Sequence, residues 1–285
     1  MLGATHTSVL IEIVKLAGCA SSSLMTPGGM AMVFGNLLPD NLPLVGVPPE
    51  LSHEMARAGR LSDELPALGT GVMVHIYTDN LTHCDNVIND GNYGASIALK
   101  LGLALMEKTG GKYFDLVERF SDRSTAYTLH TIIELAADVL SANQEVVDAI
   151  ETSWLALGES YMKVLDMIGH IYDVDPDKLR EGIKKFPPEN RPPPEVIYSR
   201  ANRTELFLRK FAPPQYDEEQ RGKDREEIME MIGAGEKMLL DKLTSMVEDF
   251  AGRILDADPE LSKMVTAIIN SDEPLLRDLK GAREP

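Results

Sequence analysis

The chain has 285 residues, of which 44% are hydrophobic, with 28 Lys and Arg against 45 Asp and Glu. This composition excludes a wholly disordered chain, and the length suits one large domain or one domain with an extension. The net charge of −17 argues against a protein that holds nucleic acid by neutralising phosphates. Two cysteines cannot form a disulfide scaffold. No apolar run of about 20 residues predicts a membrane-spanning helix.

The N-terminal segment allows two interpretations. Residues 16–19, Leu-Ala-Gly-Cys, resemble a bacterial lipoprotein cleavage box. However, the segment has no basic start, and Glu12 and Lys15 interrupt its apolar stretch as they would on an amphipathic helix. We therefore favour a cytoplasmic protein over a lipoprotein acylated at Cys19.

Apolar residues recur at helical spacing along most of the chain, which predicts an all-α helical bundle. The predicted helices of the first part span residues 7–18, 95–108, 113–121, 126–142 and 145–171. Ser124 or Thr125 could cap the fourth of these helices, and Asn143 the fifth. The Pro- and Gly-rich segment 21–66 is expected to be largely loop.

A proline-rich linker divides the chain at residues 187–194, where five of eight residues are Pro. It separates a metal-binding helical domain, residues 1–186, from a charged helical extension, residues 195–285. Helices are predicted in the extension over residues 201–211 and 222–256. We expect their apolar stripe to pack on the first domain or on a second copy of the chain, which would give a homo-oligomer.

Histidines and carboxylates form two patterns typical of metal sites. Residues 75–83 read H-x3-D-x3-H, and four-residue steps advance about 40° beyond a full helical turn. His75, Asp79 and His83 should therefore project from one helix stripe. His130 and Glu134 form a second pair, H-x3-E, among apolar neighbours, where an unpaired carboxylate would be costly. Imidazole and carboxylate ligands favour zinc, or alternatively iron or manganese.

One such pair alone is more often a side-chain hydrogen bond or an ion pair on a helix surface. Two pairs in one domain, one of them extended to a third candidate ligand, favour metal binding. Asp138, two turns after His130, is expected to be a surface carboxylate without a role in the site.

In their order along the chain, these positions resemble the zinc-dependent phospholipase C family, whose helical fold is shared with the single-strand-specific zinc nucleases. That family has an N-terminal His, an Asp in a loop, a further His, an H-x3-D helix followed by another His, and finally H-x3-E or H-x3-D. The matching positions are His6, Asp40, His53, His75, Asp79, His83, His130 and Glu134. The match covers residues 1–140 and implies a bundle of the phospholipase C type.

Two features depart from the secreted members of that family. Their third His follows the helix Asp at a longer spacing, a position that Asp85 occupies here, so Asp85 is a second-choice ligand. The closer spacing of His83 resembles the intracellular and glycosyl-phosphatidylinositol-phospholipase branch. Secreted members also use an N-terminal Trp amine as a ligand, for which the amine of Met1 is the available substitute.

The resemblance implies two or three zinc ions. Asp40, His53 and His75 would hold one ion, which Asp79 would bridge to a second ion bound by His6. The third ion would be bound by His83, His130 and Glu134.

The implied reaction is hydrolysis of a phosphodiester by a metal-bound hydroxide. Asp40 would act as proton acceptor, and Asp79 would matter most among the carboxylates. The substrate would be a small phosphodiester or a phospholipid head group, because the net charge should repel nucleic acid.

Two other functions remain open. A phosphohydrolase of the HD type would need adjacent His and Asp residues, and the nearest match is His83-Cys84-Asp85. A non-catalytic protein could use a metal ion to join its helices and its acidic extension to bind a partner. An open coordination position distinguishes an enzyme from such a structural site.

Overall fold

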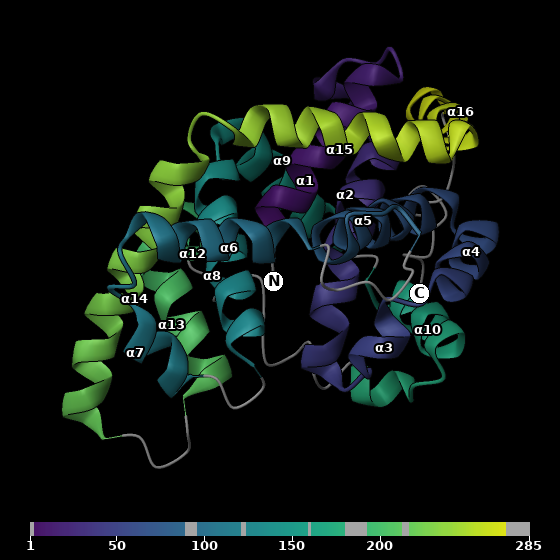
Figure 1. Ribbon diagram of the computed structural model, residues 1–285. Helices are drawn as coiled ribbons and strands as arrows, with labels where there is room; N and C mark the ends of the chain where they lie inside the picture. Colours follow the sequence, from purple (N-terminus) through teal and green to yellow (C-terminus); the bar gives the residue numbers. More distant parts are fainter. Residues whose placement is uncertain are drawn as a thin grey trace.

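The computed structural model describes residues 3–88, 96–120, 124–158, 161–179, 193–212 and 217–271. Within these ranges all regular structure is helical, which confirms the predicted all-α class (Figure 1). The longer helices of the first part are α1 (Gly3–Leu16), α2 (Pro27–Asn41), α4 (Met55–Glu64), α5 (Pro66–Cys84), α6 (Ile97–Lys108), α8 (Thr125–Ser141), α9 (Gln144–Gly158) and α10 (Tyr161–Tyr172). None of the helices in the described ranges is long and apolar enough to cross a membrane.

Several predicted helix starts are confirmed by their capping bonds. Ser124 Oγ accepts a hydrogen bond from the Tyr127 amide at 3.1 Å and begins α8. Asn143 Oδ1 accepts one from the Val146 amide at 3.1 Å, at the start of α9. Each side chain satisfies an amide that has no partner within the first helical turn.

The prediction of a loop over residues 21–66 was wrong, because this segment contains α2, α4 and the short helix α3 (Pro49–Ser52). Its prolines begin helices instead of preventing them. Pro27, Pro49 and Pro66 all lie in the first turn of a helix, where an amide proton is not needed. Thr26 caps α2 by accepting a hydrogen bond from the Gly29 amide at 3.2 Å.

Two predicted long helices are confirmed as helical. The segment predicted over residues 145–171 contains α9 and α10, and residues 159–160 between them lie outside the described residues. The segment predicted over residues 222–256 contains α14 (Glu218–Leu239) and α15 (Leu243–Ala257), with a turn at residues 240–242 between them. The continuity predicted for this second segment was therefore wrong.

Helices α2 and α5 pack unusually closely because glycines face backbone at their crossing. A Cβ atom added at Gly35 would lie 2.0 Å from the carbonyl oxygen of Leu68, and one at Gly71 would lie 2.0 Å from that of Met32. Only glycine fits at such distances. The close approach brings the end of α2, which carries Asp40, beside the middle of α5, which carries His75.

The C-terminal helices cover the first part of the chain. Besides α14 and α15 they are α13 (Arg200–Phe211) and α16 (Pro259–Asn270). Helices α13 and α14 pack on α8, α15 contacts α1 and α5, and α16 contacts α5 and α2 (Figure 1). Buried residues of α15 and α16 share one hydrophobic core with α1 and α2. Residues 187–192 of the predicted linker lie outside the described residues, so the domain boundaries stay a prediction.

Candidate metal centre

All eight side chains singled out by the sequence converge on one region. They come from five places: α1 carries one, the end of α2 one, the residue after α3 one, α5 three and α8 two. Three groups have potential ligand atoms within 4.8 Å of one another, and these are His6, Asp40 and His75; His53, His75 and Asp79; and His83, His130 and Glu134. Five of the six histidines of the chain are therefore in the cluster, and the sixth, His170, is exposed on α10.

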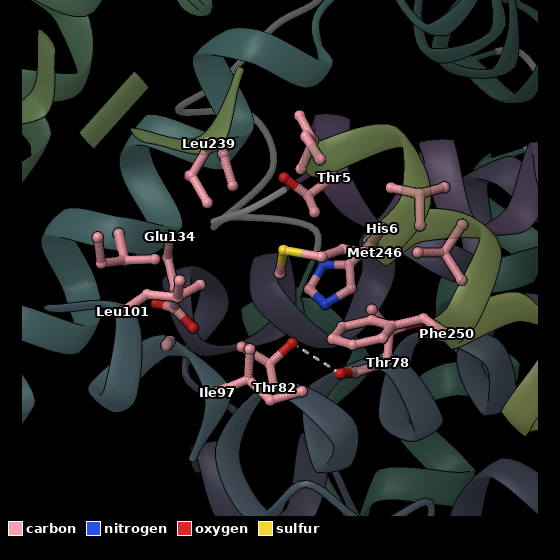
Figure 2. A pocket seen from close by; sticks show the side chains of 16 residues that line it. Thr5, His6, Thr78, Thr82, Ile97, Leu101, Glu134, Leu239, Met246 and Phe250 are labelled. Atoms are coloured by element: carbon pink, nitrogen blue, oxygen red, sulfur yellow. Dashed lines mark hydrogen bonds between the residues drawn. The ribbon is translucent and has the colours of Figure 1, made fainter. Parts of the chain in front are cut away.

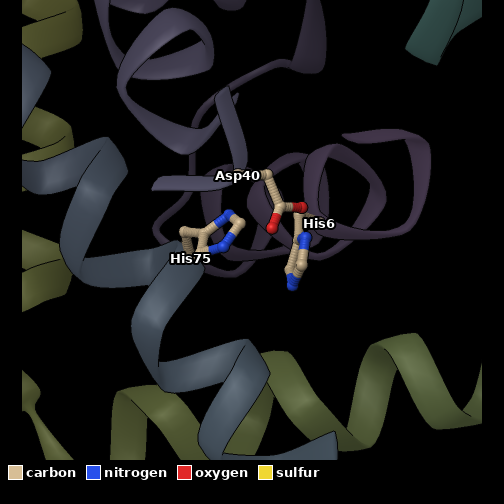
Figure 3. Close-up of side chains that lie close together, drawn as sticks. All are labelled: His6, Asp40 and His75. Carbon is tan, nitrogen blue, oxygen red and sulfur yellow. The ribbon is translucent and has the colours of Figure 1, made fainter. Parts of the chain in front are cut away.

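The first two groups share His75 and are joined through Asp79. The Asp79 carboxylate lies 3.1 Å from His6 Nε2 and 3.3 Å from His53 Nε2, through different oxygens. Asp40 Oδ1 lies 3.9 Å from His53 Nε2. Figure 3 shows the Asp40 carboxylate beside the His6 and His75 rings, which lie 4.0 Å apart. Asp79 thus contacts a histidine of each of these two groups.

The third group adjoins the first two through His83. His83 Nε2 lies 3.7 Å from Asp79 and 3.5 Å from Glu134, so this ring stands between two carboxylates. His130 Nε2 lies 2.7 Å from Glu134 Oε1. The His83 and His130 rings are stacked with centroids 4.3 Å apart. The eight side chains therefore form one continuous cluster.

Supporting hydrogen bonds turn two ring nitrogens toward each other. His75 Nδ1 lies 2.7 Å from the Asn36 carbonyl oxygen, and His53 Nδ1 lies 3.0 Å from that of Pro49. The Asn36 carbonyl only accepts, so His75 Nδ1 donates and the Nε2 of a neutral His75 ring carries a lone pair. His53 Nδ1 also lies 2.8 Å from Ser52 Oγ, and His53 Nε2 lies 3.3 Å from Asp79 Oδ2. The two Nε2 atoms face each other at 3.3 Å, so the His75 lone pair can accept a proton from His53 or bind a cation placed between the rings.

Ser96 fixes His130 in the same way. Its hydroxyl donates to the Thr82 carbonyl oxygen at 3.0 Å and lies 3.2 Å from His130 Nδ1. The ionised Glu134 carboxylate only accepts, so His130 Nε2 donates to it, and the ring is held between Ser96 and Glu134. Such supporting bonds are the usual companions of metal-binding histidines. Neither Asn36 nor Ser96 was predicted, because their contacts join helices distant in sequence.

Charge in the cluster favours a neutral ring at His75 and a cation at His83. Burial, together with the nearby His6, lowers the pKa of His75 well below its usual value. Burial would raise the pKa of Asp79, but His83 and His6 hold it well below the usual range. Burial opposes protonation of His83, yet Asp79 and Glu134 raise its pKa to about 9. Positive charge is therefore stabilised between these two carboxylates.

Glu134 is ionised despite its burial. Burial would raise its pKa, but His130, and after it His83, lower it to about 2. A carboxylate that stays charged among apolar neighbours needs a partner of opposite charge.

The donor atoms fit bound divalent ions. Zinc bonds to nitrogen and oxygen of about 2.0–2.2 Å place tetrahedral ligand atoms roughly 3.4 Å apart. The contacts of Asp79 with His6, His53 and His83 span 3.1 to 3.7 Å. The residue set implied by the resemblance for a third ion is also one of the observed groups. These residues could hold a metal ion, and only their chemistry bears on which one.

Two further candidates have different outcomes. Asp85 ends α5 with its carboxylate on Arg253, at 2.9 Å, and on Lys100, at 3.3 Å. Asp85 thus belongs to none of the three groups that the described residues form. The amine of Met1 lies outside the described residues.

Asp138 was predicted to be a surface carboxylate, and this was wrong. Its side chain is fully buried and caps the start of α1, where Oδ1 accepts from the amides of Ala4 at 2.8 Å and Thr5 at 3.1 Å. The other oxygen forms an ion pair with the buried Arg203 of α13. Periodicity placed Asp138 on α8 but could not show that two other helices meet there. Asp138 therefore anchors the turn of α1 that carries His6.

No family model, curated protein or solved structure matches this chain.

Proposed function

We propose that this protein is a metal-dependent phosphoesterase that acts on phosphodiesters and uses two or three zinc ions. The observation that supports this most is the pair of Nε2 atoms of His53 and His75, which face each other 3.3 Å apart beside Asp79. Metal-binding histidines are oriented in this manner by carbonyl groups. The resemblance in residue order to zinc-dependent phospholipases C supplies the reaction class.

The number of donors favours a catalytic arrangement over a structural one. A structural zinc ion is closed by four protein ligands, whereas a catalytic one keeps a position open. Three ions would need roughly 12 ligand positions, more than the eight side chains supply even if carboxylates are shared. Positions would then remain for water and substrate. Two ions could be closed completely, so metal stoichiometry distinguishes the enzyme from the metal-joined bundle.

Divalent ions held in this cluster would lower the pKa of a water molecule and neutralise phosphate oxygens. The protein's own part is positioning. The Asn36 carbonyl and the Ser96 hydroxyl set the rings of His75 and His130. Asp79 joins the groups. Asp40 is about one-quarter exposed, so it can accept a proton from an attacking water and pass it to solvent.

The geometry gives the HD-type alternative little support. Such an enzyme needs adjacent His and Asp side chains at one ion, but Asp85 is turned to Arg253 and Lys100, away from His83's partners. A small phosphodiester or a phospholipid head group remains the proposed substrate, since a chain with a net charge of −17 repels polyanions.

The test starts with elemental analysis of protein purified without added metal. We expect two or three zinc ions per chain, hydrolysis of bis-p-nitrophenyl phosphate, loss of that activity with a chelator, and recovery with zinc. The melting temperature should fall on metal removal, because clustered ligands repel once the ions are gone. Metal-free protein with an unchanged melting temperature, or metal-loaded protein without hydrolysis, would exclude the enzyme.

A further inference from the structure

An apolar pocket adjoins the metal cluster (Figure 2). His6 of the first group and Glu134 of the third group are both among its lining residues. The wall opposite them comes from the C-terminal helices and includes Leu239, Met246 and Phe250. A molecule held at the cluster could therefore extend directly into this pocket.

The pocket offers almost no polar or cationic group to a ligand. Among the residues that the structure describes, His6 and Glu134 are the only titratable groups in its lining, and neither Lys nor Arg lines it. Three threonines contribute hydroxyls, but Thr78 donates to the Val74 carbonyl at 2.8 Å and Thr82 donates to that of Thr78 at 2.9 Å. The donors of Thr78 and Thr82 are therefore already used within α5, and the third hydroxyl, that of Thr5, accepts from Ser141 at 3.4 Å. A second phosphate, a sugar or a nucleobase would lose its hydrogen bonds to water here without replacement.

We infer that this pocket binds an unbranched apolar chain attached to the phosphorus group held at the cluster. The inference rests on the proposed function for the position of that group and adds the class of substituent that the site selects. Apolar walls stabilise an alkyl chain by removing it from water, and the adjoining cluster supplies all the recognition of charge.

The size of the pocket sets the length of that chain. Its volume is about 40 Å³, room for roughly three water-sized spheres. A chain of about three carbon atoms should fill it, and each added methylene should raise affinity about fourfold, from the transfer free energy of one CH₂ group. Longer chains should gain little, because their ends would return to solvent.

The experiment measures binding of n-alkylphosphonates, from methyl to octyl, to zinc-loaded protein by titration calorimetry. Alkylphosphonates are not hydrolysed, so the readout is independent of turnover. Wild type should bind butylphosphonate at least tenfold more tightly than methylphosphonate. Ala137→Leu fills the pocket and should remove this preference without weakening methylphosphonate binding. Ala104→Leu, at an exposed position of α6 outside the pocket, is the matched control.

A second variant guards against misfolding of the first. Met246→Gln keeps the length of a half-buried side chain of α15 but makes the wall polar, and should reduce the gain per methylene. Equal affinities of wild type for methyl- and butylphosphonate, or an unchanged preference in both pocket variants, would overturn the inference. Chain-length dependence without hydrolysis of any phosphodiester would uphold the pocket and reject the proposed function. Hydrolysis of bis-p-nitrophenyl phosphate without chain-length dependence would uphold the proposed function and reject the pocket as a binding site for an alkyl chain.

Discussion

The helices that carry the candidate ligands and the C-terminal helices contribute to the site in opposite ways. Helices α1, α2, α5 and α8, together with His53 after α3, supply the side chains with metal-binding chemistry, and the patterns on α5 and α8 can be recognised one helix at a time. The C-terminal helices have neither His nor Cys, yet they and the residues that cap them contact the ligand helices through charged and polar groups, among them Arg203, Arg253 and Asp258. The candidate ligands can thus be found from short sequence patterns, whereas the residues that hold them in place come from distant parts of the chain.

The three contacts lie next to the ligands. Arg203 pairs with Asp138, which anchors the start of α1 before His6. Arg253 holds Asp85, the residue that ends α5 just after His83. The hydroxyl of Tyr77, between His75 and Asp79 in sequence, donates to Asp258 at 3.0 Å. Burial and this carboxylate raise the pKa of Tyr77 to about 12, so the hydroxyl keeps its proton and the bond.

The largest effect is expected on the ligand side, from Asp79→Asn. The amide keeps the shape of the side chain but removes its charge and one good ligand oxygen from a position between three histidines. Hydrolysis of bis-p-nitrophenyl phosphate should fall by more than about 100-fold, the upper range for losing only a supporting residue, and bound zinc should decrease.

The control for this variant must be a carboxylate on the surface. Asp63→Asn, at an exposed position of α4, meets that need, whereas the buried Asp138 does not. Unchanged metal content and activity in the Asp79 variant would remove the bridging role and leave only a shared scaffold with the phospholipases.

On the C-terminal side the largest effect should come from Arg203→Met. Methionine preserves apolar packing but leaves the Asp138 carboxylate buried without its cation, which costs about 3–5 kcal/mol. Urea denaturation of metal-free protein measures this cost, and zinc titration should show weakened binding because His6 is no longer held. Arg209→Met, exposed on the same helix, should change neither quantity. If both variants behave alike, the C-terminal helices do not support the site through this pair.

The close approach of α2 and α5 gives a third comparison within the ligand side. Gly71→Ala places a Cβ atom against the Met32 carbonyl and should destabilise the protein by at least about 1–3 kcal/mol, the usual cost of overpacking. Gly59→Ala adds the same atom to α4 with nothing within 4 Å. It should stabilise by up to about 1 kcal/mol, since alanine favours helix more than glycine does. Denaturation curves that place both variants on the same side of wild type would contradict this account.

Sequence reasoning succeeded where one helix contains the information. The four-residue spacing of His75, Asp79 and His83 is a property of α5 alone, and capping by Ser124 depends on the next three residues. It failed where the effect of a residue depends on its position within the helix. Pro27 was interpreted as a helix breaker, although the same residue in a first turn starts α2.

The remaining failures concern contacts between distant segments. Nothing local distinguishes Asp138 from a surface carboxylate, because its partners are amides 133 and 134 residues away and Arg203 on another helix. The apolar pocket was missed for the same reason, since part of its wall comes from α14 and α15. The glycines in α2 and α5 were an available signal, because glycine inside a helix is unfavourable unless close packing requires it.

The smallest effect is expected for Asp85→Asn, the partly exposed contact between the two regions. Asparagine tolerates the left-handed conformation at this position, where φ is 54°, and Arg253 can still donate to the backbone carbonyl at 2.7 Å. Only the ion pair is lost, so we expect the free energy of unfolding to fall by less than about 1 kcal/mol at low salt, and by less again at 1 M salt.

Partial burial would raise the pKa of Asp85, but hydrogen bonds from Arg253 and Lys100 lower it. Because the pKa of Asp85 is lower in the folded chain than in the unfolded chain, its ion pair stabilises the fold above the unfolded-state pKa of about 4. This stabilisation is lost as the pH falls through the folded-state pKa. The difference between variant and wild type in urea denaturation should therefore be present at neutral pH and shrink in acid. A difference that persists unchanged in acid and in high salt would show that Asp85 joins the two regions by its conformation and not by its charge.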